Sequence, residues 1–149
     1  RGLPVHGLIV GGVEEKKRAY LAELKARVAE MGLADDISFT GLRSDIREVF
    51  SQCQLVLSLS TQPETFGRTV LEALSLGTPV VAWDQGGVGE ILQACHPEGA
   101  VTTNDNAALE QAVIHALHAG PRNKPVEHFR LADMCAETLA TYTTLAHKA

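Results

Sequence analysis

The chain has 149 residues, of which 45% are hydrophobic and 21% charged, and its formal net charge is −5. This length fits one domain with one independent core. The acidic balance, without a basic patch, argues against a nucleic-acid partner. No apolar run approaches the roughly 20 residues of a membrane-spanning helix. The N-terminal apolar run is too short for a signal peptide, so we expect a cytoplasmic protein.

Cysteine and histidine spacing gives no metal or disulfide signal. Cys53, Cys95 and Cys135 are odd in number and far apart, which favours buried or half-buried thiols over a zinc site or a disulfide framework. His115 and His118 are three residues apart on an expected helix, but no third ligand is evident. We therefore expect surface histidines and no metal.

The first third of the chain predicts two strands joined by a helix. Residues 5–10 (VHGLIV) form an apolar run typical of a buried strand. Gly11 and Gly12 then favour a tight turn over a phosphate loop. A helix is expected over residues 14–31, with an apolar stripe of Leu21, Leu24, Val28 and Met31. A second strand is expected over residues 37–40.

The remainder continues the alternation of helices and strands. Helices are expected over residues 45–53, 67–76 and 106–117, and from the glycine-rich loop at residues 84–90 onward. Strands are expected over residues 55–59, buried on both faces, and over 78–83 and 100–102. A linker at 122–125 precedes a threonine-rich helix over 129–147, which we expect to depend on docking. This pattern predicts an α/β fold with a Rossmann-like parallel sheet and helices on both faces.

Polar residues follow the third and fourth strands, where open α/β sheets bind ligands. In the helix over residues 67–76, Val70, Leu71 and Leu74 face the core and Arg68 lies on the opposite stripe. A helix N-terminus favours acidic residues, so Arg68 breaks a local rule. Gly67 leaves backbone N–H groups free for an anion such as a diphosphate. An ordinary ion pair between Arg68 and Glu72, one helical turn later, explains the arginine at this position equally well.

Two glutamates flank this loop-to-helix joint. Glu72 could accept hydrogen bonds from a ribose diol, and Glu64 from sugar hydroxyls. A solvated helix face for Glu72, and favourable placement near a helix N-terminus for Glu64, remain equally open. Gly86 and Gly87 permit a phosphate nest, close packing against the first loop, or a plain turn.

A combination of residues across the centre of the chain resembles the retaining GT-B glycosyltransferases of the group 1 (family 4) type. The matching residues are Ser58, Pro63, Glu64, Phe66, Gly67, Arg68, Glu72, Ala73, Gly77, Pro79, Val80, Val81, Ala82, Gly86, Gly87, Glu90 and Ile91. The upstream segments LIVGG and ISFTGLRSDI extend the likeness over nearly the whole chain. By this resemblance, residues 1–149 form one nucleotide-sugar-binding domain, the C-terminal half of a GT-B fold, with residues 120–149 as linker and docking helix.

The resemblance also implies site residues. Glu64 is the catalytic candidate and contacts donor-sugar hydroxyls, and Glu72 holds the ribose. The residues implied to face the donor sugar and diphosphate are Thr65, Phe66, Gly67 and Arg68. Those implied on the base side are Gly41, Leu42 and Arg43, with Gly86 and Gly87 as a second loop.

The implied reaction moves a sugar from a nucleotide diphosphate to an acceptor hydroxyl with retention, without metal or cofactor. A nucleotide-sugar 2-epimerase of GT-B architecture and a non-catalytic nucleotide-sugar-binding module are the alternatives. The family's donor half opens with one more strand and helix, carrying an arginine and a lysine, and its N-terminal domain binds the acceptor. We therefore expect a fragment of a larger two-domain enzyme, inactive alone. Acceptors in the resembled family often belong to cell-envelope glycans such as lipopolysaccharide. Such an acceptor is compatible with peripheral association of the full-length enzyme with the inner face of the membrane.

Overall fold

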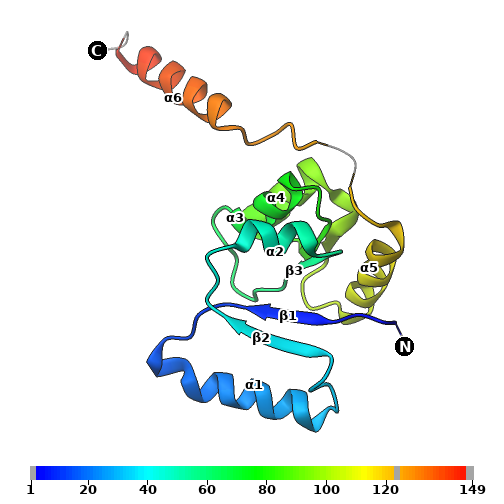
Figure 1. Ribbon diagram of the computed structural model, residues 1–149. Helices are drawn as coiled ribbons and strands as arrows, with labels where there is room; N and C mark the ends of the chain where they lie inside the picture. Colours follow the sequence, from blue (N-terminus) through cyan, green and yellow to red (C-terminus); the bar gives the residue numbers. More distant parts are fainter. Residues whose placement is uncertain (1–2, 123–124, 147–149) are drawn as a thin grey trace. The chain divides into compact units, whose positions relative to one another are not determined.

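The computed structural model describes residues 3–122 and 125–146, and the chain forms two compact units, residues 1–46 and 47–149 (Figure 1). All strand pairs in both units are parallel among the described residues. The elements alternate between strand and helix up to β5, as the hydrophobic pattern predicts. The predicted α/β class, with parallel sheets and helices on both faces, is confirmed.

The first unit is a strand–helix–strand unit. Strand β1 (Gly7–Val10) pairs with β2 (Ile37–Gly41), and the register shifts between Ile9 and Val10. The crossover contains a short 3₁₀ helix, η1 (Glu15–Lys17), and the helix α1 (Arg18–Glu30). Gly32 follows Met31, the C-cap residue of α1, and its φ of +69° is a conformation that glycine adopts without steric cost.

Two burial predictions for this unit are wrong. Leu8 and Ile9 of β1 are 47% and 44% exposed, although the run was expected to be buried. Met31 is exposed, whereas the other three members of its stripe are half-buried. A two-stranded sheet with one helix offers too little apolar area to cover both sheet faces and the helix end.

The second unit is built on a three-stranded sheet in the order β3-β4-β5. The strands are β3 (Val56–Ser58), β4 (Val80–Trp83) and β5 (Ala100–Val101). The helices are α2 (Ile46–Gln52), α3 (Arg68–Ser75), α4 (Gly86–Cys95), α5 (Asn106–Ala119) and α6 (Leu131–Ala146), with a 3₁₀ turn η2 (Pro97–Gly99). Each of these three strands is one or two residues shorter than its sequence prediction, because strand pairing covers fewer residues than the predicted run.

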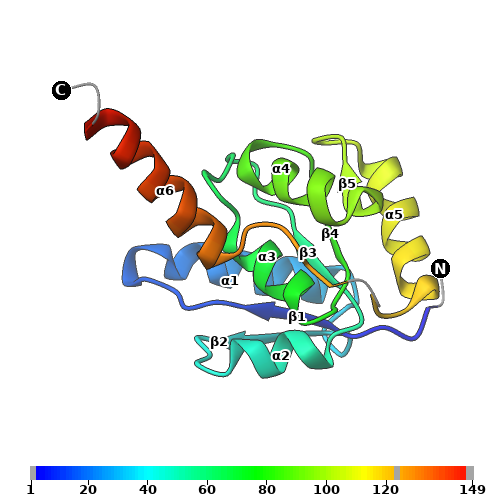
Figure 2. The same ribbon diagram turned by 90° about the horizontal axis from the view of Figure 1, so that it is seen from above.

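The core of this unit surrounds β4. All four of its residues are buried, as expected for a central strand of a parallel sheet. Val81 and Trp83 pack with Val101 and with Ala116 of α5. The alternation of side chains places Val80 on the opposite face, and α3 and α4 also pack against β4 (Figure 2). The sheet therefore holds the ends of β3 and β4, and the loops that follow them, in fixed register.

Strand β3 differs from its prediction of burial on both faces. Val56 is buried, but Leu57 is 49% exposed. Leu57 lies beside Val81 in the register, on the face where α5 packs, and α5 contacts β4 and β5. Because β3 lies at the edge of this sheet away from β5, and α5 packs on β4 and β5, Leu57 is left uncovered on the α5 side.

The cysteines follow the prediction only in part. Cys53 and Cys95 are half-buried, and burial raises the pKa of both thiols. Cys135 is exposed, which contradicts the expected burial, because every described side chain of α6 is exposed.

Helix α6 is two residues shorter at its start than predicted, and residue 147 of the prediction lies outside the described residues. So do residues 123–124 of the predicted linker. Four threonine hydroxyls donate to the carbonyl four residues earlier: Thr138, Thr141, Thr143 and Thr144. Its docking stays a prediction. Across the described residues, no helix combines the length and apolarity that crossing a membrane requires.

Candidate functional site

Two loops at the carboxyl end of the second unit's sheet pack directly on each other. One joins β3 to α3 and carries Glu64 and Thr65, and the other leads from β4 into α4. A Cβ on Gly86 would lie 2.6 Å from the carbonyl oxygen of Glu64. A Cβ on Gly87 would lie 2.5 Å from the carbonyl oxygen of Thr65. Side chains are thus excluded at both glycines by the backbone of the first loop.

This geometry selects among the roles that the sequence leaves open for the glycine-rich loop. The backbone N–H of Gly87 donates to the carbonyl oxygen of Glu64 at 2.8 Å. That N–H is therefore engaged and does not form a nest for phosphate. Gly86 and Gly87 serve close packing in the free protein, and their contact with a donor stays a prediction.

The start of α3 is shaped by Gly67. Its φ of +85° is the left-handed conformation that favours glycine, and a Cβ there would lie 2.7 Å from a methyl group of Val88. Gly67 is the residue before the helix, and no side chain caps the helix there. The partial positive charge at the N-terminus of α3 and its first backbone N–H groups are therefore not neutralised by a capping side chain.

Arg68 and Glu72 point along the exposed stripe of α3, as predicted. The Arg68 Nη2 lies 3.4 Å from the Glu72 Oε1, and the two side chains are 83% and 43% exposed. The free protein thus shows the ordinary ion pair. A long, exposed pair of this kind contributes little free energy, about 0–1 kcal/mol. Either partner can exchange it for a ligand at low cost.

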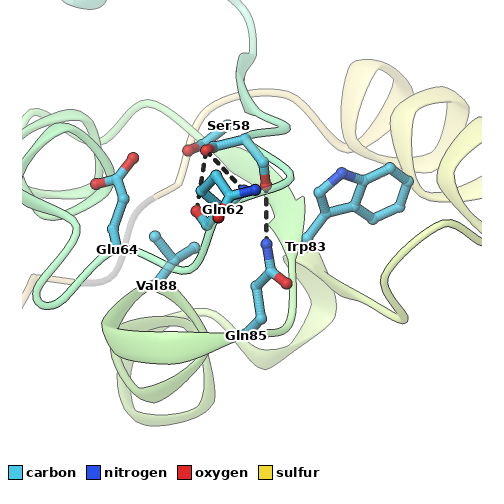
Figure 3. A pocket seen from close by; sticks show the side chains of 7 residues that line it. Ser58, Gln62, Glu64, Trp83, Gln85 and Val88 are labelled. Carbon is cyan, nitrogen blue, oxygen red and sulfur yellow. Dashed lines mark hydrogen bonds between the residues drawn. The ribbon is translucent and has the colours of Figure 1, made fainter.

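Glu64 is exposed beside a small hollow of about 10 Å³ (Figure 3). The hollow is lined by Ser58, Ser60, Gln62, Glu64, Trp83, Gln85 and Val88. Its volume is close to the least that holds one water molecule. The lining is rich in hydroxyl and amide groups, so the hollow suits one hydroxyl group rather than a whole sugar ring.

Phe66, on the same loop, is 45% exposed and has an aromatic partner from a distant segment. Its ring meets that of Phe129 edge to face, with centroids 6.0 Å apart and planes at 83°. Phe129 lies two residues before α6 and has a φ of +61°, which is uncommon for a bulky residue. The segment leading to α6 therefore contacts the predicted donor-binding loop.

The three base-side candidates belong to the first unit. Gly41 has a φ of +72°, and Leu42 is 86% exposed. The Arg43 Nε donates to Asp45 Oδ1 at 2.9 Å, and a second guanidinium nitrogen pairs with the other carboxylate oxygen. This hydrogen bonding lowers the pKa of the Asp45 carboxyl and raises the pKa of Arg43. The Arg43 side chain is thus occupied in the free protein, whereas Leu42 presents an exposed apolar surface.

Sequence reasoning missed two residues of this region, Gln85 and Phe129. Gln85 occupies the position before α4, where Ser, Thr, Asp or Asn normally caps a helix, and it makes no capping bond. The sequence signal for Gln85 was a glutamine at a position where a shorter capping side chain is usual. Phe129 carried no signal, because its contact partner is 63 residues away.

The described residues contain no group of three metal-ligating side chains. His115 and His118 are both exposed, as expected of surface histidines. The prediction that the reaction needs no metal stays a prediction.

Comparison with known proteins identifies the family. The sequence model of the family described as "Glycosyl transferases group 1" matches residues 1–119. This chain belongs to the group 1 glycosyltransferases. The resemblance of the motif residues to group 1 glycosyltransferases is thereby confirmed, whereas the retaining mechanism stays a prediction.

Individual glycosyltransferases agree with this assignment. The chain is 35% identical, over 139 residues, to the lipopolysaccharide core biosynthesis mannosyltransferase LpsB of Rhizobium meliloti, covering 92% of this chain and 37% of that protein. The crystal structure of Anabaena HepE in complex with UDP is similar at a TM-score of 0.66 and 33% identity, over 78% of this chain and 31% of that one. The sucrose-phosphate synthase of Thermosynechococcus elongatus shares the fold, with a TM-score of 0.72 at 22% identity, over 95% of this chain and 39% of that one. The chain thus spans about a third of the length of each of these relatives.

Proposed function

We propose that this chain is the donor-binding domain of a retaining glycosyltransferase that takes a nucleotide-diphosphate sugar. The observation that carries the proposal is the uncapped start of α3, where Gly67 has no side chain and Arg68 is held only by a long, exposed ion pair. A diphosphate there would interact with the helix dipole, the free N–H groups and the guanidinium together. The HepE complex with UDP supports a nucleotide ligand.

In this proposal the two glutamates bind different parts of the donor. Glu72, on the exposed face of α3, accepts hydrogen bonds from the ribose hydroxyls once the ligand displaces Arg68. Glu64, beside the hollow, binds hydroxyls of the donor sugar. Backbone groups of Thr65, Phe66 and Gly67 lie between these ends. Gly41, Leu42 and Arg43 are proposed to contact the base.

The proposed transfer depends on electrostatic stabilisation rather than on a metal. A departing nucleoside diphosphate gains negative charge as the glycosidic bond breaks. The start of α3 and the Arg68 guanidinium would stabilise that charge, which lowers the barrier. We propose that the whole protein is a cytoplasmic enzyme acting on a cell-envelope glycan, because LpsB acts in lipopolysaccharide core biosynthesis. Association with the inner face of the membrane and the docking of α6 belong to the same proposal.

A donor screen on the full-length protein tests this function. UDP-, GDP- and ADP-sugars are incubated with a cell-envelope glycan extract, and nucleotide release and product are followed by NMR spectroscopy. We expect glycan-dependent release from one donor, with the anomeric configuration of the donor kept in the product. An inverted product would contradict the retaining mechanism. A 2-epimerised sugar, or binding without release, would instead identify the epimerase or the non-catalytic module.

A further inference from the structure

Gln85 connects the loops that follow all three strands of the second unit. It stands directly before α4 but does not cap that helix. Its side-chain Nε2 donates instead to the carbonyl oxygen of Ser60, at 2.8 Å, in the loop after β3 (Figure 3). Its Oε1 accepts from the hydroxyl of Thr103, at 3.4 Å, in the segment after β5. Both ends of the amide thus have a partner within the protein.

The loop that Gln85 holds is the one that ends at Glu64. Ser60 Oγ donates to the carbonyl oxygen of Gln62 at 3.0 Å and accepts from the backbone N–H of Gln62 at 3.3 Å. At the other end of this segment, the N–H of Gly87 donates to the carbonyl oxygen of Glu64. Residues 60–64 are therefore fastened to the start of α4 at both ends, by the Gln85 side chain and by the Gly87 backbone.

Apart from these bonds and its packing against the start of α4, the segment has little to hold it. All residues from 60 to 66 are exposed, so burial contributes little to their order. Gln85 is half-buried and lines the hollow beside Glu64, together with Trp83. A hydrogen bond in such a partly enclosed place makes a net contribution to stability, so it helps an exposed loop to keep one conformation.

We propose that Gln85 is a positioning residue for the donor sugar: it fixes residues 60–64 and thereby aims the Glu64 carboxylate over the hollow. The proposal rests on the assignment of Glu64 to the donor sugar made under the proposed function. It goes further in predicting which half of the donor responds. Loss of Gln85 disturbs the sugar end near Glu64 and leaves the nucleotide end near Arg68 and Glu72 in place, because those two residues lie on α3.

Two variants at Gln85 and one matched control test the proposal. Gln85→Leu removes both hydrogen bonds at similar volume. Gln85→Glu keeps the shape and the acceptor for Thr103 but places an oxygen against the carbonyl of Ser60, so it guards against a folding defect of the leucine variant. Gln93→Leu is the control, because Gln93 lies on the same helix and its Nε2 bonds to Asp84 Oδ2 at 2.9 Å, in a pair that does not reach residues 60–64.

Calorimetry on the full-length protein compares UDP with UDP-glucose, and GDP with GDP-mannose, for each variant. We expect both Gln85 variants to bind the sugar nucleotide at least fivefold more weakly than wild type, while the free nucleotide changes less than twofold. The control should change neither. Amide hydrogen exchange of residues 60–66 should accelerate in both Gln85 variants and not in the control.

The two readouts separate the failure of this proposal from failure of the proposed function. If wild type binds none of the four compounds and no ADP-sugar, the proposed function fails, and the sugar-positioning role fails with it. If wild type binds a sugar nucleotide but the Gln85 variants bind it equally well, the positioning role alone is overturned. Unchanged hydrogen exchange at residues 60–66 overturns it as well. An equal loss of nucleotide and sugar-nucleotide affinity also overturns it, because the role predicts a loss confined to the sugar nucleotide.

Discussion

At the scale of single residues, Arg43, which is proposed to contact the base, is already paired with another side chain in the free protein. Its guanidinium is held by Asp45 two residues later, and this pairing lowers the pKa of the Asp45 carboxyl. A ligand that recruits Arg43 must compete with that pair. Because both side chains are exposed, a ligand has to replace the Asp45 carboxylate but does not have to uncover a buried Arg43.

The pairing gives a direct prediction in pH titration. In the variant Arg43→Gln, the pKa of Asp45 should rise toward its ordinary value, because the hydrogen-bonding cation that favours the carboxylate is gone. NMR titration of the Asp45 carboxyl carbon measures this. Arg27→Gln, which removes an exposed cation from α1, is the control and should leave the Asp45 titration unchanged. An identical Asp45 midpoint in wild type and Arg43→Gln would refute the assigned cause.

Residue types alone predicted some of the site and not the rest. The sequence shows that Arg68 stands in the first turn of a helix, where acidic residues are favoured, because this depends only on residues close together in the chain. The ion pair with Glu72 was therefore foreseen as one of two readings. Gln85 was missed because its partners, Ser60 and Thr103, lie 25 and 18 residues away in the chain. Only the parallel sheet brings the ends of three strands together.

At the scale of elements, two helix starts interlock through glycine. The first loop of the site lies against the start of α4 so closely that Gly86 and Gly87 have no room for a Cβ. The positions of α3 and α4 are thus coupled through backbone contact as well as through the sheet. The sequence predicted both helices, but it left open whether this glycine pair binds phosphate or packs.

A Gly87→Ala substitution tests this interlocking. The added methyl group would meet three backbone atoms, of Thr65 and Phe66, at 2.5–2.6 Å. Backbone cannot yield as a flexible side chain does, so we expect a loss of about 3 kcal/mol in the free energy of unfolding, at the upper end for overpacking. Gly11→Ala is the matched control, because a Cβ there meets nothing within 4 Å, and it should change stability by less than about 0.5 kcal/mol. Urea unfolding that finds the two variants equally stable would contradict the packing role.

Element boundaries and burial show where the sequence is ambiguous. The strands and helices were placed correctly because their apolar periods are clear. Burial was overestimated for β1 and for Leu57 of β3, because an apolar run indicates that a strand can be buried and does not say what covers it. Coverage depends on the number and order of strands in the sheet, which no local pattern encodes.

At the scale of the whole molecule, the chain belongs to the group 1 glycosyltransferases and spans 37% of the length of LpsB. The strongest link between family and chemistry is α3, whose uncapped start and exposed Arg68–Glu72 stripe present a dipole, a cation and a carboxylate on one side of the helix. We propose that this stripe binds the nucleotide of the donor, with Glu72 on the ribose.

Titration of the full-length protein with UDP, GDP and ADP, in wild type and in Glu72→Ala, tests that claim most directly. A carboxylate that accepts two hydrogen bonds contributes about 1.5–3 kcal/mol, so the variant should bind the preferred nucleotide at least tenfold more weakly. Glu48→Ala removes an exposed carboxylate from α2 and should bind as wild type does. We predict a loss of affinity confined to Glu72→Ala; equal affinity in wild type and Glu72→Ala would contradict the account.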